Sequence, residues 1–305
     1  YPNYVAYPNT DWMRAMFKPG IYQKHSVTAN GSTDKVKYLI SFSYMDNPGV
    51  IDNSALKKFS YRANVSSQIT KWLEVGAKIY GYRQDTELSD ISGSMTLLSR
   101  AVPGIYPYYD GKYGWMENTE QSSESRNNLY FFNRYKGSNV THYSNMAAFL
   151  NITLPFNIRY HASFNYSWRD ALQKQHPTLG DAYSFSRDET AYTYNDLSKL
   201  YLKYTQSHTG RWVFQTRLDW AESFGKHDVT AMVGFEAYQV KDQSFASTKT
   251  GFENDVLEEL NNVIEATTIE GTQNDYAAAS LYGRATYAYD SRYLAEVNIR
   301  YDGSS

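Results

Sequence analysis

The feature that most constrains this chain is the strict alternation of apolar and polar residues over long stretches. Side chains of a β-strand point alternately to its two faces, so such a pattern predicts a strand with one apolar and one polar face. From Ile158 to Arg169, one face carries aliphatic and aromatic residues, and the other carries arginines, serines, His161 and Asn165. The same alternation recurs in 73–80, 145–154 and 229–237. The chain is therefore predicted to be built almost entirely from two-faced strands.

Ten segments fit this pattern well enough to be candidate strands. Most of them exceed the usual length of strands in globular proteins, and a tilted strand needs about 9–11 residues to cross a bilayer. The candidate strands are 21–31, 36–46, 58–69, 73–85, 140–154, 157–169, 210–222, 228–242, 276–289 and 293–301.

The connections between these segments alternate between short and long without exception. The short ones are 32–35, 70–72, 155–156, the turn near 224–227, and 290–292. The long ones are 47–57, 86–139, 170–209 and 243–275. Tight periplasmic turns opposite long extracellular loops are typical of bacterial outer-membrane barrels. We therefore predict an all-β fold: an antiparallel up-and-down transmembrane β-barrel, partial, with about ten strands, long extracellular loops and short periplasmic turns.

Composition supports a barrel and excludes several other classes. The mean hydropathy is −0.61 and the longest apolar run is only Met146–Leu150, so no transmembrane helix is predicted. In a barrel only alternate residues face membrane lipid, so hydropathy averages out along each strand. A net charge of −2 argues against nucleic acid as a partner. The absence of cysteine removes disulfides, zinc–thiolate sites and cysteine nucleophiles.

Several segments resemble one known family. They are the opening Tyr7–Trp12 with Gly20, Gln23 and His25, the hairpin 26–44, the continuation 49–51 and 59–65, and the closing Arg300–Ser305. In order and spacing these segments are similar to the SusC/RagA family of TonB-linked outer-membrane proteins. The resemblance implies a plugged barrel driven by TonB, which works with a SusD-like surface lipoprotein to import oligosaccharides or peptides. Outer-membrane transporters of this kind have 22 strands, so ten strands are under half of one barrel.

The chain is expected to be a piece of a longer protein. Within the chain, two parts are predicted. Residues 1–20 are predicted to be the connection from plug to barrel, with a short helix over 10–17 capped by Thr10 or Asp11. Residues 21–305 are predicted to be part of the receptor barrel. The chain opens without a signal peptide and stops directly after a strand-like run, and the segment that contacts TonB is absent from it.

A search for chemistry in the sequence yields no catalytic candidate. The nucleotide-binding, zinc-protease and serine-hydrolase motifs are all missing, so we predict that the protein is not an enzyme. The six histidines never pair at the spacing of metal ligands. No metal and no cofactor are therefore predicted, although the sequence leaves open a surface Ca²⁺ site in the loops.

Two groups of residues are the candidates for ligand contact. An aromatic run in the longest loop could stack on sugars through flat rings with hydrogen-bonding tips, or it could pack the loop against itself, the plug or a partner. Its candidate binding residues are Tyr106, Tyr108, Tyr109, Tyr113 and Trp115. Charged residues on the polar strand faces are expected to line the lumen, where they serve the permeation path, dock the plug or simply keep the wall polar. These are Lys78, Arg159, Arg217, Glu236 and Arg284.

Two other classes compete with an importer. A soluble all-β glycan-binding module would share the alternation and the 30 tyrosines, but it has no reason to place every long loop at one end. An outer-membrane barrel enzyme would carry a nucleophile with its base on the strands, and no such setting is recognisable. The importer is therefore the function that the sequence favours.

Overall fold

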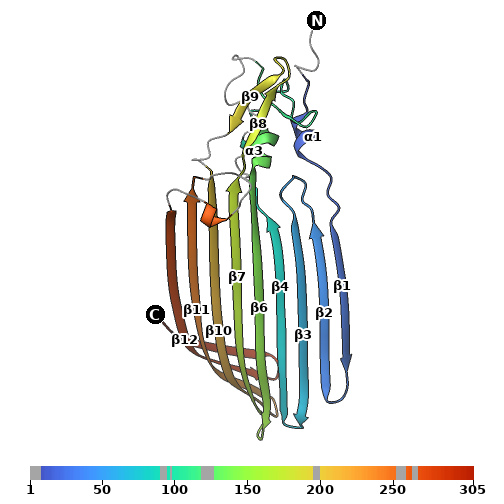
Figure 1. Ribbon diagram of the computed structural model, residues 1–305. Helices are drawn as coiled ribbons and strands as arrows, with labels where there is room; N and C mark the ends of the chain where they lie inside the picture. Colours follow the sequence, from blue (N-terminus) through green and yellow to red (C-terminus); the bar gives the residue numbers. More distant parts are fainter. Residues whose placement is uncertain are drawn as a thin grey trace.

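The computed structural model describes residues 8–89, 95–96, 98–117, 127–194, 200–251, 259–262 and 267–305. These residues form one large antiparallel sheet of ten strands and a smaller assembly at one of its ends (Figure 1). The order in the sheet is the order in the chain, β1-β2-β3-β4-β6-β7-β10-β11-β12-β13. The predicted up-and-down antiparallel barrel is thus confirmed, and the sheet is open, as a partial barrel must be.

Every candidate strand predicted from the alternation is present. The strands of the sheet are β1 (Gln23–Ser32), β2 (Val36–Asn47), β3 (Leu56–Thr70), β4 (Leu73–Glu87), β6 (Tyr135–Leu154), β7 (Ile158–Pro177), β10 (Tyr201–Phe224), β11 (His227–Thr250), β12 (Thr267–Tyr289) and β13 (Tyr293–Ser304).

In the large sheet, β6, β7, β10, β11 and β12 are longer than the sequence predicts, mainly at the end that faces the long connections. β10 and β11 have 24 residues each and pair in register from Tyr201–Thr250 down to Phe224–His227. The apolar alternation stops where a strand leaves the lipid, but its backbone hydrogen bonding continues. The predicted boundary therefore marks the edge of the apolar band and not the end of the strand.

The two faces of the sheet differ as the alternation predicts. On β7, Phe164 and Tyr166 are exposed on the outer face, in register with Phe214 and Trp212 of β10. Aromatic side chains at the short turns are also exposed, with Phe156 at 84%. A wide exposed apolar face is a liability in water, whereas it suits contact with lipid. The exposed large apolar residues of the outer face include Val27, Phe42, Phe59, Tyr61, Val65, Met146, Leu218, Val233, Phe235, Leu281, Val297 and Ile299.

A compact head covers the loop end of the sheet, which is the upper end in Figure 1. It contains α3 (Asn128–Arg134) and a three-stranded sheet of β5 (Tyr113–Gly114), β8 (Gly180–Ser184) and β9 (Glu189–Tyr194). Neither was predicted, because each element is too short for its periodicity to stand out within a long polar connection.

The N-terminal segment packs against the same end. The predicted short helix is confirmed as α1 (Trp12–Met16), and Asp11 caps it by accepting a hydrogen bond from the Arg14 amide. The indole Nε1 of Trp12 donates to the Val102 carbonyl at 2.7 Å. Met16 is buried with Ile51 and Phe132 of the head. The spacing of Ile91, Met95 and Leu98 also predicts a short helix over 91–101, of which residues 91–94 and 97 lie outside the described residues.

Candidate functional site

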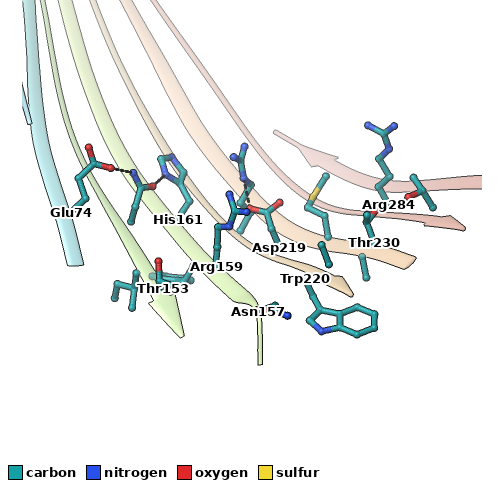
Figure 2. A pocket seen from close by; sticks show the side chains of 17 residues that line it. Glu74, Thr153, Asn157, Arg159, His161, Asp219, Trp220, Thr230 and Arg284 are labelled. Carbon is teal, nitrogen blue, oxygen red and sulfur yellow. Dashed lines mark hydrogen bonds and ion pairs between the residues drawn. The ribbon is translucent and has the colours of Figure 1, made fainter. Parts of the chain in front are cut away.

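The polar face of the sheet, called here the inner face, carries a hollow of about 1020 Å³ near the short turns (Figure 2). Residues from β4, β6, β7, β10, β11 and β12 line it. Three of the five predicted lumen residues, Arg159, Arg217 and Arg284, are among them. The hollow is called the basin below.

A chain of hydrogen bonds crosses three strands on one side of the basin. Asn151 of β6 donates from Nδ2 to Glu74 Oε2 of β4 at 2.9 Å. Its Oδ1 lies 2.6 Å from Nδ1 of His161 on β7. Because the three residues are direct cross-strand neighbours, the register of β4, β6 and β7 positions them without any loop. This arrangement fixes a carboxylate, an amide and an imidazole on a rigid wall.

Ion pairs dominate the other side of the basin and the wall beyond it. Arg217 Nε lies 3.0 Å from Asp219 Oδ2, and an Arg284 terminal nitrogen lies 2.7 Å from Glu296 Oε2. Arg300 pairs with Asp302 at 2.7 Å and approaches Glu236 at 3.7 Å. These side chains are about half exposed, so each pair contributes little to stability by itself. Their effect is to set the charge pattern of the wall.

The remaining predicted lumen residues lie on the same face but outside the basin. Lys78 places its ammonium 5.2 Å from the ring centroid of Phe149. Glu236 accepts a hydrogen bond from Gln215 Nε2. The structure thus puts all five predicted residues on one face and brings only the three arginines together.

Sequence reasoning missed the partners that complete the wall. Glu74, Asn151, His161 and Asp219 all line the basin, and none was a candidate. Each lies on the polar face that the alternation predicts, but the register between strands decides which of them meet. Register depends on turn geometry and on pairing across the sheet, which one strand's pattern does not contain.

The aromatic loop residues lie in the head. Trp115 is buried and stacks on Tyr192 of β9, with ring centroids 4.3 Å apart and planes 7° apart. Tyr113 packs edge-on against Tyr130, and Tyr106 stacks on Tyr109 at 5.0 Å. Tyr108 and Tyr109 remain about half exposed. The inner rings of the run therefore pack the head against itself, and the outer two remain exposed at its surface.

Two groups hold the head together at its centre. Asn127 is fully buried, and its Nδ2 donates to the carbonyls of Tyr106, Pro107 and Gly114 at 2.8–2.9 Å. Tyr130 donates its hydroxyl to the Gly180 carbonyl at 2.9 Å, and burial raises the pKa of Tyr130 to about 12. These contacts make the head a folded unit that presents Tyr108 and Tyr109 on a rigid support.

Curated proteins similar to this chain are all receptors of one kind. TonB-dependent receptor P3 of Formosa agariphila is 27% identical over 99% of this chain and 30% of its own length. TonB-dependent receptor SusC of Bacteroides thetaiotaomicron is 23% identical over 97% of the chain. The predicted resemblance to the SusC/RagA family is confirmed. No family model matches the chain, and the chain spans about a third of the length of these relatives.

Solved structures similar to this chain share its fold. The RagAB peptide importer in its open-open state superposes with a TM-score of 0.82 at 22% identity, over the whole chain and 34% of the importer chain. The receptor FpvA of P. aeruginosa superposes with a TM-score of 0.56 at 13% identity, over 93% of this chain and 35% of its own. These superpositions confirm the predicted fold, and the TonB-dependent receptors among the curated relatives confirm the predicted outer-membrane location.

No three histidine, aspartate or glutamate side chains of the described residues gather closely enough to hold a metal ion. Among the helices that the structure describes, none has the length and apolar character that crossing a membrane requires.

Proposed function

We propose that the complete protein imports oligosaccharides or peptides across the outer membrane, driven by TonB. One observation carries the proposal: ten strands present an apolar face outward and a charged, polar face inward, in a chain that resembles TonB-dependent receptors over almost its whole length. The SusC/RagA resemblance implies glycans or peptides, and the importer of similar fold is named for peptides. No covalent chemistry is part of this function, so the protein is not an enzyme.

The basin supplies the inner wall for this task. Arg159, Arg217 and Arg284 serve the permeation path or hold the plug against the barrel, together with Lys78 and Glu236 higher on the wall. The half-exposed ion pairs suit this role, because weakly held partners can exchange when the plug moves. Residues 1–20 remain assigned to the connection from plug to barrel, and α1 packs against the head at the loop end.

The loop aromatics supply ligand capture outside the membrane. Tyr108 and Tyr109 offer exposed rings that pack against Tyr113 and Tyr106, respectively, and Trp115 is buried within the same head. A SusD-like lipoprotein at the surface is the proposed partner, and TonB is contacted through a segment outside this chain.

Uptake by living cells tests the proposal. A strain that lacks the native gene is complemented with the complete protein and given fluorescent oligosaccharides and peptides. Uptake of one class that an uncoupler of the inner membrane abolishes is the expected result. The variant Arg217→Gln/Arg284→Gln should reduce uptake several-fold, whereas Lys226→Gln/Arg292→Gln, which removes the same charge at the short turns, should not. Equal uptake with and without the complete protein contradicts the proposal.

The soluble glycan-binding module, which the sequence alone left open, differs from the importer in one measurable property. The module would fold in plain buffer, whereas the barrel requires detergent because its outer face is apolar.

A further inference from the structure

Three tyrosines meet on the inner face, at and above the middle of β4 and β6 on the loop side of the basin. Tyr82 and Tyr143 are direct cross-strand partners whose ring centroids lie 5.3 Å apart in a stacked arrangement. Tyr80 contacts both rings, at 6.2 and 6.0 Å. None of their hydroxyls makes a hydrogen bond within the part of the chain that the structure describes. The triad therefore presents aromatic surface and free hydroxyl groups to the lumen.

Cations surround this triad. The Lys58 ammonium lies 3.8 Å from the ring centroid of Tyr82, and the Arg62 guanidinium lies 5.4 Å from that of Tyr80. Lys78 lies two residues before Tyr80 on β4, on the same face and closer to the basin. In the described residues, no carboxylate lies within ion-pair distance of any of these three cations. Contact with the rings holds the charges in place without neutralising them.

The two halves of the inner face carry opposite excesses of charge. On β1 to β7 its only carboxylate is Glu74, among the strand residues that the structure describes. The cations of that half are Lys24, Lys37, Lys58, Arg62, Lys78, Arg159 and Arg169. Most inner-face carboxylates stand instead on β10 to β13, where Arg217, Arg284 and Arg300 pair with them.

We infer that the tyrosine triad with Lys58 and Arg62 is a subsite for an acidic oligosaccharide, whose ring stacks on tyrosine while its carboxylate or sulfate pairs with the cations. The inference rests on the proposed importer function and names its substrate class. Aromatic rings with hydroxyl tips suit sugar faces and hydroxyls, and cations without a carboxylate partner attract an anion. Charge complementarity thus selects the ligand, and the cations continuing toward the basin give it a path along one wall.

Binding to the complete protein in detergent tests this subsite. Isothermal titration calorimetry is run with hexagalacturonate, with the neutral cellohexaose and with hexaglutamate as an acidic peptide. We expect hexagalacturonate to bind at least about tenfold more tightly than either of the others, and its affinity to fall as salt is raised. Equal binding of the acidic and neutral sugars, or tighter binding of hexaglutamate, overturns the inference.

Matched variants locate the binding at the triad. Lys58→Met/Arg62→Met should weaken hexagalacturonate binding by about 10- to 100-fold, since each charge-assisted contact contributes about a factor of ten. Lys35→Met/Lys71→Met removes the same charge from exposed turns and should change the affinity less than about twofold. The exchange Lys58→Arg/Arg62→Lys keeps both charges and should keep most of the binding, which separates loss of charge from loss of fold.

The outcomes distinguish the subsite from the wider function. If cells that carry the complete protein take up neutral glycans or peptides while hexagalacturonate binds no better than cellohexaose, the inference fails and the importer stands. If no ligand is taken up at all, the importer proposal and the subsite inference both fail. Unchanged affinity in the Lys58→Met/Arg62→Met variant also contradicts the subsite.

Discussion

Phe149 lies across Gly76, its direct cross-strand partner, so closely that a Cβ at position 76 would come within 2.3 Å of the ring. The same relationship recurs between Gly234 and Tyr282, where the distance is 2.4 Å. The missing side chain lets an aromatic ring fold down over the neighbouring strand and cover it. On the inner face this brings the ring of Phe149 under Lys78 and close to His161.

The variant Gly76→Ala should destabilise the barrel by about 1–3 kcal/mol, because Phe149 must leave its position and the Val65 carbonyl is also only 2.9 Å away. Gly283→Ala is the matched control, since its nearest neighbour would be the Met232 carbonyl at an ordinary 3.5 Å. Urea unfolding of the complete protein in lipid vesicles measures both. Equal stability of the two variants would show that the ring does not depend on the glycine.

Replacement of Asn127 should strongly destabilise the head. Replacing it with alanine removes a buried donor shared by three carbonyls and also the cap that accepts from the Tyr130 amide. We expect a loss of about 2–3 kcal/mol in the stability of the head, and more for Asn127→Asp, which points a second oxygen at those carbonyls. Removal of the exposed cap in Asp11→Ala should cost about 1 kcal/mol at most. Trp115 fluorescence during urea unfolding reports the difference.

The sequence predicts the sheet well and the head poorly, for a physical reason. Along β7, Phe164 lies on the apolar face and Asn165 on the polar face because successive side chains of a strand alternate between its faces. The sequence of this one strand is therefore enough to predict both positions. The meeting of Glu74, Asn151 and His161 depends on the register of three strands, which no local pattern encodes. The tyrosine triad was missed for the same reason, since two of its rings come from β4 and the third from β6.

The head was missed because tertiary contacts, more than local propensity, determine its elements. α3 has seven residues, and it is stable because Tyr130 is buried against Trp115 and the small sheet, while Phe132 is buried with Met16 and Ile51. Asn127 alone carried a local signal, as a helix cap within a polar run. Sequence analysis placed the residues before it in a long loop, and 118–126 lie outside the described residues.

Tyr130 should make the stability of the head depend on pH under alkaline conditions. Its pKa is raised from 10.0 to about 12, so the folded head favours the neutral phenol. The resulting contribution, roughly 2–3 kcal/mol, is fully present below pH 10 and is lost as the pH rises through about 12. In Tyr130→Phe the part of this dependence that Tyr130 contributes should be lost between those values. Urea midpoints followed through Trp115 at several pH values check it, and an unchanged slope in the variant would contradict the assignment.

Adjacent residues on β7 provide the sharpest test of which face meets lipid. Phe164 lies in the centre of the outer apolar band, in register with Ala148 and Phe214, while Ser163 faces the lumen beside Phe149. An arginine at the bilayer midplane costs about 2–4 kcal/mol, whereas the same residue on a wet inner wall can remain hydrated. Phe164→Arg should therefore lower the stability of the complete protein in vesicles by about that amount. Ser163→Arg should change it by less than about 1 kcal/mol. If the two variants were equally stable, or if Ser163→Arg were the more damaging, the sheet would be facing the membrane with the opposite side, and the basin and the triad would not line a lumen.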